Sequence, residues 1–174
     1  MANPIVPKKT TEYGLLMFDV PVSRPYLYTK IRKAVGKCCV PVNLSVYMFD
    51  WGLKNSLDMS FQSMNAYTEA SVHMVKFDPS EKDKLEELAN KQLEIVFSKI
   101  NFRLQQALKD AGSSEAKEKT LSTVEKRLQG YERLLVLYDF TNKVQPSLDI
   151  LKKIVVTQFN LIKGVNNGIS TNKV

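Results

Sequence analysis

The 174-residue sequence predicts an α+β fold, in which a small sheet layer is followed by a long helical hairpin and a C-terminal helix. Three observations support this class. Short apolar runs with strand character alternate with helical periodicity up to about residue 79. Helical periodicity then continues to about residue 142, with a heptad pattern in the part that follows Glu115. Clusters of glycine, serine and proline separate the helices of the second half.

The first predicted element is a strand from Tyr13 to Asp19, which follows a polar arm at residues 1–12. Its consecutive apolar residues, Leu15 to Phe18, are typical of a central strand or one covered on both faces. Val20-Pro21 ends the strand, because proline cannot donate to a strand ladder. The arm contains prolines and a lysine pair, so we expect it to be flexible.

A basic helix is predicted from Arg24 to about Lys37. Ser23 is the expected N-cap, and Pro25 suits the first turn of a helix. The buried face is expected to carry residues at spacings of three and four. These residues are Tyr28, Ile31 and Val35.

Cys38 to Trp51 alternates apolar and other residues, which indicates strand structure. Two interpretations remain: one long strand, or a bend near Pro41 followed by a strand from Asn43 to Asp50. We favour the bend, because proline is confined to the edges and bulges of sheets. The periodicities that follow predict a helix over Leu53 to Ala70 and a third strand over Ser71 to Phe77.

Two long helices are predicted next, from Ser80 to about Ala111 and from Glu115 to about Asn142. The short Gly112-Ser113-Ser114 turn between them favours an antiparallel hairpin. The second helix carries two apolar series with seven-residue spacing, typical of the a and d positions of a heptad. These series are Leu121, Leu128 and Leu135, and Val124, Tyr131 and Tyr138. This seam is either intramolecular core or a subunit interface, and we favour at least a dimer.

A last amphipathic helix is predicted after Gln145-Pro146-Ser147, and Gly164 is expected to end it. Its segment Ile154 to Ile162 could instead form a strand, although helical spacing is favoured. The predicted organisation is an arm, a sheet layer, a helical hairpin, a C-terminal helix and a tail. Their ranges are 1–12, 13–79, 80–142, 143–164 and 165–174.

The formal net charge of +7 and the sequence pI near 9.3 favour polyanionic partners, such as DNA or RNA. The alternative is a lysine-rich surface that only solvates the protein. The basic helix concentrates the residues that could contact phosphates and stack on bases. The candidate nucleic-acid-binding residues are Arg24, Tyr26, Tyr28, Lys30, Arg32, Lys33 and Lys37.

Several kinds of site are not indicated by the sequence. Cys38 and Cys39 are adjacent, and we expect both to be reduced, because neighbours in an extended chain point to opposite faces. The single histidine, His73, has no obvious catalytic partner next to it. Glycine-rich phosphate loops and zinc motifs are also missing from the sequence. An uncharged run long enough to cross a membrane is absent too, and a cytoplasmic location is expected.

Two strand signatures resemble a known ferredoxin-like domain. The residues are LLMFDVP, which includes Asp19, and NLSVYMF, which begins at Asn43. They are similar to signatures of the small subunit of CRISPR adaptation complexes and of the C-terminal domain of phenylacetate-type repressors (PaaX). The later VEKRLQGYERLLVLYDF resembles the N-terminal domain of chromate-resistance regulators (ChrB). The resemblance covers residues 13–142. The sequence lacks a winged helix, and only Arg24 represents the arginines that usually follow the first strand.

The resemblance to the CRISPR subunit implies a catalytic and metal-binding role for Asp19. In that family, two such aspartates across a dimer have been proposed to hold a divalent metal for phosphodiester cleavage. Carboxylate oxygens suit Mg²⁺, which can activate water and neutralise phosphate charge. On this reading the chain would be a metal-dependent nuclease with Mg²⁺ as its cofactor.

The function that we favour from the sequence is a non-enzymatic, self-associating module that binds nucleic acid or a protein partner. A regulatory role would fit such a module. The nuclease that uses Asp19 is one alternative. A structural or inhibitory scaffold protein, of viral origin, is another. The sequence favours neither a resident cofactor nor membrane insertion.

Overall fold

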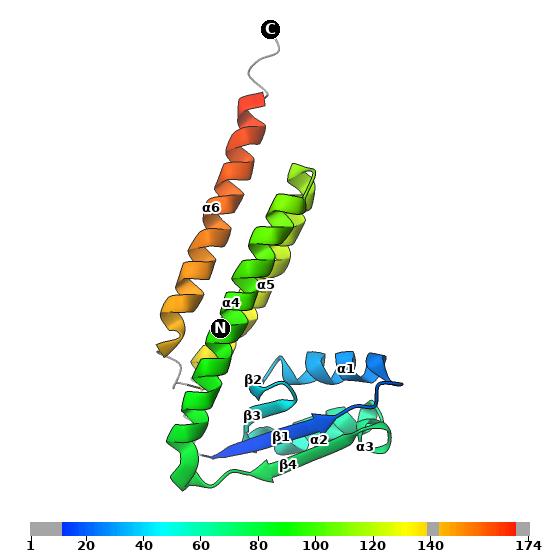
Figure 1. Cartoon of the computed structure of the whole chain (residues 1–174). Helices are drawn as coiled ribbons and strands as arrows, with labels where there is room; N and C mark the ends of the chain where they lie inside the picture. Colours follow the sequence, from blue (N-terminus) through cyan, green and yellow to red (C-terminus); the bar gives the residue numbers. More distant parts are fainter. Residues whose placement is uncertain (1–11, 139–142, 170–174) are drawn as a thin grey trace, which may run out of the picture. The chain divides into compact units, whose positions relative to one another are not determined.

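The computed structural model describes residues 12–138 and 143–169. Most of the predicted arm, the end of the hairpin at residues 139–142 and the last five residues of the tail lie outside the described residues. The chain divides into two units: Met1–Leu93 with Leu134–Thr141, and Glu94–Arg133 with Asn142–Val174. The α+β class is confirmed, with a sheet followed by three long helices (Figure 1).

The first unit contains a four-stranded antiparallel sheet with the strand order β2-β3-β1-β4. The strands are β1 (Tyr13–Asp19), β2 (Cys39–Asn43), β3 (Val46–Asp50) and β4 (Ser71–Lys76). Leu15 of β1 faces Met48 on one side and Val75 on the other. The helices α1 (Pro25–Val35) and α2 (Lys54–Ser63) connect the strands in a β-α-β-β-α-β order. This order and sheet arrangement are ferredoxin-like.

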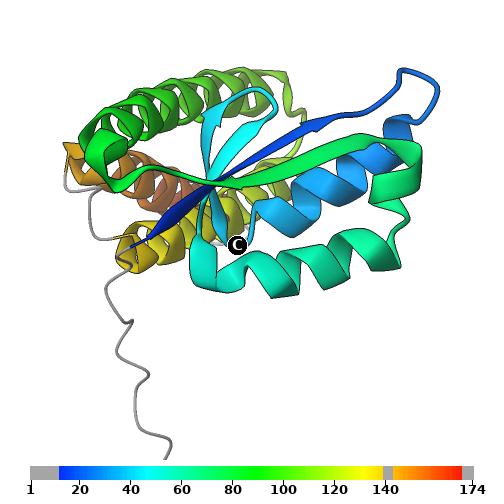
Figure 2. The same cartoon turned by 90° about the horizontal axis from the view of Figure 1, so that it is seen from below.

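Both connecting helices pack on the same face of the sheet, side by side (Figure 2). Alternate residues of β1 and β3 point into this core, since successive side chains of a strand face opposite sides. The core residues from the strands are Leu16, Phe18, Cys39, Tyr47, Phe49 and Val72. Those from the helices are Leu27, Ile31, Val35, Leu57 and Phe61.

The region from Cys38 to Trp51 differs from both sequence interpretations. It forms two strands, β2 and β3, which pair with each other as a hairpin. The chain reverses at Leu44-Ser45, where the Asn43 side-chain oxygen accepts a hydrogen bond from the Leu44 amide. Pro41 lies inside β2, which is an edge strand, and the pairing with β3 shifts register between Pro41 and Asn43, since proline is accommodated at sheet edges and bulges. The hairpin supplies the fourth strand that the sequence interpretation lacked.

Two predictions for the helices of the sheet layer were wrong. Arg24, and not Ser23, occupies the capping position of α1, and within the described chain no side chain caps this end. The helix predicted over Leu53–Ala70 is interrupted at Asn65, whose φ of 56° is left-handed. Asparagine tolerates this conformation better than most residues. The segment therefore contains a short 3₁₀ turn, α2 and the four-residue helix α3 (Ala66–Glu69).

The long helices of the second half are α4 (Lys82–Asp110), α5 (Ser114–Leu137) and α6 (Gln145–Ile169). The boundary between the two units falls within α4 and α5. The helix predicted from Ser80 begins two residues later, at Lys82, after a 3₁₀ turn in which Asp78 accepts a hydrogen bond from the Ser80 amide. The helix predicted for 154–162 is confirmed, but Gly164 does not end it, because α6 continues past this residue.

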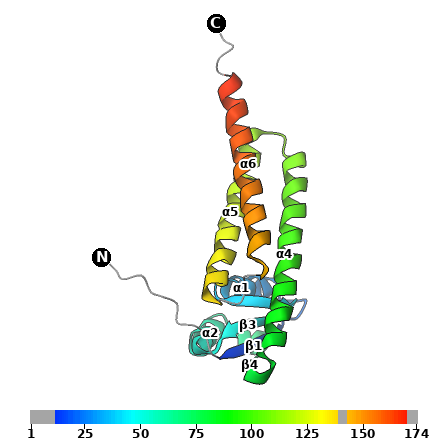
Figure 3. The same cartoon turned by 90° about the vertical axis from the view of Figure 1, so that its left-hand side faces the viewer.

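In the second unit, α6 and the included parts of α4 and α5 lie alongside one another (Figure 3). Phe97 and Tyr131 meet edge to face with ring centroids 5.3 Å apart. Lys152 of α6 forms an ion pair with Glu132 of α5 at 2.7 Å. The buried apolar residues here include Leu104, Leu121, Leu128, Leu148, Leu151 and Val155. None of the helices in the described part of the chain has a stretch sufficiently long and apolar to span a lipid bilayer.

Candidate nucleic-acid interface

The outer face of α1 carries the basic residues that the sequence singled out. The buried positions of this helix are Leu27, Ile31 and Val35, which recur every four residues and pack against the sheet. The observed buried face therefore includes Leu27 in place of the predicted Tyr28, which is only half-buried. Because the buried stripe is this narrow, most of the remaining positions project into solvent. Those with positive charge are Lys30, Arg32 and Lys33, and Lys37 follows just after the helix.

Three of these cations are available to a ligand. Lys30, Lys33 and Lys37 are exposed, and no carboxylate of the described chain forms an ion pair with them. Their positions three and four residues apart place them along one side of the helix and its C-terminal extension. An exposed row of this kind can contact successive phosphates of a polyanion.

Two tyrosines lie among these cations. The Lys30 ammonium lies over the Tyr26 ring, 5.5 Å from its centroid, and the Arg32 guanidinium lies over the Tyr28 ring at 5.6 Å. Tyr26 is 45 % exposed, whereas Tyr28 also packs against Phe18 of the core. The interface therefore offers one accessible aromatic ring on which a base could stack.

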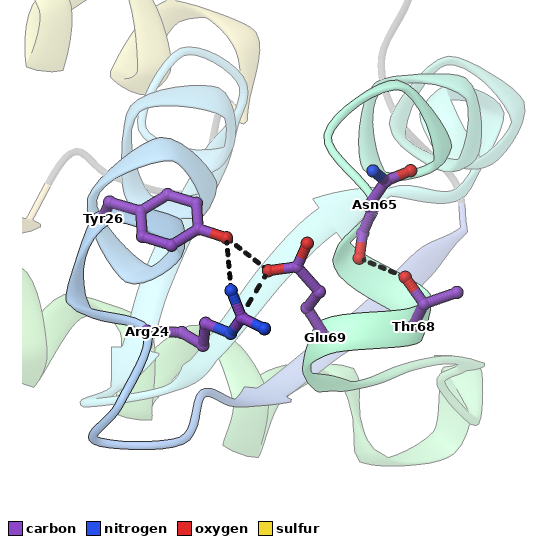
Figure 4. Close-up of polar contacts among 5 residues, drawn as sticks. All are labelled: Arg24, Tyr26, Asn65, Thr68 and Glu69. Atoms are coloured by element: carbon purple, nitrogen blue, oxygen red, sulfur yellow. Dashed lines mark hydrogen bonds and ion pairs between the residues drawn. The ribbon is translucent and has the colours of Figure 1, made fainter.

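A polar cluster joins the start of α1 to the end of α3 (Figure 4). The Tyr26 hydroxyl donates a hydrogen bond to the Glu69 carboxylate, and an Arg24 guanidinium nitrogen donates to the Tyr26 hydroxyl at 3.4 Å. The Arg24 Nε atom lies 3.7 Å from the same carboxylate. The hydrogen bond to Glu69 raises the pKa of Tyr26, so this hydroxyl stays protonated as a donor.

The position of Glu69 depends on the left-handed turn at Asn65. The Asn65 carbonyl accepts hydrogen bonds from the Thr68 hydroxyl at 2.9 Å and from the Glu69 amide at 3.1 Å. These bonds close the short helix α3 and bring its last residue next to Arg24. Sequence reasoning missed Glu69, because Glu69 and its partner Tyr26 lie 43 positions apart in the chain.

Glu69 divides the predicted binding residues into two groups. The Glu69 carboxylate pairs with Arg24 and accepts a hydrogen bond from Tyr26. Lys30, Lys33 and Lys37 follow these residues in the chain and form no ion pair with a carboxylate of the described residues. Ion pairs of exposed side chains contribute only about 0–1 kcal/mol. A phosphate group could therefore displace Glu69 from Arg24 at a small energetic cost.

Asp19 lies at the exposed end of β1, opposite Ser71 of β4. His73, two residues further along β4, has its Nε2 atom 2.9 Å from the Ser71 hydroxyl oxygen. The sequence shows no catalytic partner adjacent to His73, and the structure adds a hydrogen-bond partner two residues away on the same strand. Both side chains are exposed, and the described residues contain no group of three or more histidine, cysteine or acidic residues that could hold a metal.

The donors around Asp19 do not fit a Mg²⁺ site within one chain. Mg²⁺ requires near-octahedral coordination by hard oxygen ligands. Asp19 supplies one carboxylate, and the neighbouring Ser71 hydroxyl is engaged with His73. A catalytic role across a dimer stays a prediction.

The heptad seam of α5 is packed inside the chain. In the second unit Leu121 and Leu128 are buried, and Val124 and Tyr131 are half-buried. In the first unit Leu135 and Tyr138 are buried. A dimer that used these residues would have to replace contacts that already exist, and self-association stays a prediction that light scattering can check.

No family model, curated protein or solved structure matches this chain. The resemblance to the CRISPR adaptation subunit, to PaaX and to ChrB therefore depends on the strand signatures and helix pattern of the sequence. The ferredoxin-like arrangement of the sheet is compatible with that resemblance, but many unrelated functions share such folds.

Proposed function

We propose that this chain is a nucleic-acid-binding module whose contact surface is the outer face of α1. The observation that carries the proposal is the exposed row of Lys30, Lys33 and Lys37, which forms no ion pairs within the described residues. Tyr26 beside this row supplies an aromatic face. Lysines contribute affinity without reading sequence, so the proposed binding has little sequence preference.

Support also comes from the rigidity of the surface. Lys30 and Lys33 lie on a helix whose opposite face is buried against the sheet, and Lys37 lies in the turn that follows, so the backbone positions of the two helical lysines are set before binding. A ligand then does not have to order this segment, which lowers the entropic cost of association. A lysine-rich surface that only solvates the protein would not require this arrangement.

The experiment compares two variants with the same change in net charge. Lys30, Lys33 and Lys37 are replaced by glutamine in one variant. In the control, the same replacement is made at exposed lysines elsewhere on the long helices, Lys109, Lys119 and Lys126. Fluorescence anisotropy with a labelled single-stranded oligonucleotide, and with its duplex, measures the dissociation constants at low salt.

We expect the α1 variant to lose at least about tenfold in affinity and the control to lose much less. Three phosphate contacts to a single strand also give a slope of about −2 for the logarithm of affinity against the logarithm of salt concentration. This slope should approach zero in the α1 variant. Equal losses in both variants would show that only net charge matters. Absence of binding by the unmodified protein would overturn the proposal.

A further inference from the structure

Cys38 and Cys39 form a close thiol pair at the junction of α1 and β2. Their sulfur atoms are 3.8 Å apart, although neighbours on an extended chain were expected to point to opposite faces. Cys38 lies in the turn that follows α1, before the extended strand begins, so its side chain is free to lie on the same side as that of Cys39. The expected separation of the two thiols was therefore wrong.

The two thiols have different surroundings. Cys39 is fully buried in the core between α1 and the sheet, whereas Cys38 is half-buried at the edge of that core. The hydrogen bond from Cys39 and the adjacent Lys37 ammonium lower the pKa of Cys38. The hydrogen bond with Cys38 and burial raise the pKa of Cys39. Cys38 is therefore the more accessible thiol and the one whose pKa is lowered, whereas Cys39 is shielded and its pKa is raised.

We propose that Cys38 and Cys39 are a peroxide-oxidisable pair that forms a reversible disulfide between neighbouring residues. Oxidation-sensitive cysteines are accessible, have a high thiolate fraction and often lie next to a second cysteine that resolves the first product. The contact between the two sulfur atoms provides this second cysteine without any large movement of the chain.

The reaction with hydrogen peroxide has two steps. The Cys38 thiolate attacks one peroxide oxygen, the O–O bond breaks, and the departing hydroxide takes up a proton to become water. The Cys39 sulfur then attacks the Cys38 sulfenic acid, the S–O bond breaks, and hydroxide leaves with the Cys39 proton as a second water. Two thiols lose two electrons in total, and these electrons reduce one peroxide to two waters.

The geometry favours a labile bond over a permanent structural disulfide. The sulfur atoms must approach from 3.8 Å to a bond length of about 2.05 Å, and a ring between neighbouring residues strains the intervening peptide. Strained disulfides have higher reduction potentials and are reduced readily by cellular thiols. The Cys38 carbonyl is also held by the Tyr138 hydroxyl, which resists the shift that the ring requires.

The test measures the mass of the full-length protein after treatment with hydrogen peroxide under native conditions. The expected product is lighter by about 2 Da, the mass of two hydrogen atoms, and dithiothreitol restores the original mass. Peptide mapping should place the change in the tryptic peptide that begins at Cys38. A gain of oxygen atoms without loss of hydrogen, or a disulfide between two chains, would overturn the proposal.

Two variants separate the roles of the thiols. Cys39→Ala should accumulate a sulfenic acid on Cys38 that dimedone traps, whereas Cys38→Ala should lose most of the peroxide reactivity. Circular dichroism checks that both variants remain folded. If Cys39→Ala does not fold, the mass and peptide map of the unmodified protein still decide the proposal. Equal reactivity of the two single variants would contradict the assigned roles.

Discussion

The Tyr26 hydroxyl donates a hydrogen bond to the Glu69 carboxylate, which links the exposed side of α1 to the end of α3. The same carboxylate forms an ion pair with Arg24. A negative charge is therefore fixed at one end of a surface that is otherwise positive. Any anionic ligand on α1 meets this carboxylate as a competitor for Arg24.

Glu69→Gln should tighten nucleic-acid binding. The substitution removes the negative charge while retaining a side chain that can accept the hydrogen bond from Tyr26. An exposed charge pair corresponds to about 0.2–1 kcal/mol, so we expect affinity to rise about 1.4- to fivefold. Glu125→Gln, at an exposed position of α5, is the matched control. Anisotropy measurements that show equal effects for the two variants would mean that Glu69 does not compete with the ligand.

Tyr138→Phe should destabilise the first unit. The Tyr138 hydroxyl donates to the Cys38 carbonyl and accepts a hydrogen bond from the Asp50 amide at 3.0 Å. It therefore links the residue that precedes β2 and the last residue of β3 to the residue that follows α5. Removal of this hydroxyl should lower the free energy of unfolding by about 1–3 kcal/mol. Urea denaturation measures the change. Tyr26→Phe, at an exposed position, should change the free energy of unfolding by less than about 0.5 kcal/mol. Equal effects would contradict the role assigned to Tyr138.

Gly14→Ala should destabilise the sheet because the position has no room for a methyl group. A Cβ atom at Gly14 would lie 2.5 Å from ring atoms of Phe49 and 2.6 Å from the Trp51 ring. Phe49 is fully buried and cannot move away freely, so we expect a loss of about 1–3 kcal/mol.

Gly130→Ala provides the opposite case. Gly130 lies in α5, and a Cβ atom there would meet nothing within 4 Å. Because alanine favours helix more than glycine does, this substitution should stabilise the protein by about 0.4–1 kcal/mol. Thermal and urea denaturation should show opposite signs for the two glycine variants. If Gly14→Ala left the stability unchanged, this would contradict the tight packing of the Phe49 and Trp51 rings against β1.

The elements that could be predicted from the sequence are those with local signals. The apolar run ending at Asp19 marks β1 correctly, and the spacing of Ile31 and Val35 identifies the buried side of α1. The favoured helix over 154–162 also follows from spacing alone. Each of these patterns lies within one element, so the chain does not have to fold for the pattern to be visible.

The β2–β3 hairpin could not be identified in the same way. Its turn contains Leu44, an apolar residue that is 76 % exposed, so the turn resembles the strand residues around it. Proline is a stronger turn signal than leucine, so the sequence placed the bend near Pro41 instead of at Leu44-Ser45. The break at Asn65 was missed because the apolar residues Phe61, Met64 and Tyr67 keep helical spacing across it, and only the left-handed φ of Asn65 reveals the interruption.

The candidate site was only partly visible in the sequence. The cations and tyrosines of α1 are clustered in the chain, so their common surface was predictable. Glu69 and the closeness of the Cys38 and Cys39 sulfur atoms were not, because they depend on tertiary contacts and on the conformation of one turn. Such contacts have no periodicity in the sequence.

The most direct test of the proposed function is a proton–nitrogen NMR titration of the full chain with a short single-stranded oligonucleotide. If the outer face of α1 is the binding surface, the largest shift changes should occur at the backbone amides of residues 24–37, with Glu69 among the affected neighbours. Changes concentrated on α5 and α6, or uniformly small changes at saturating ligand, would contradict this account.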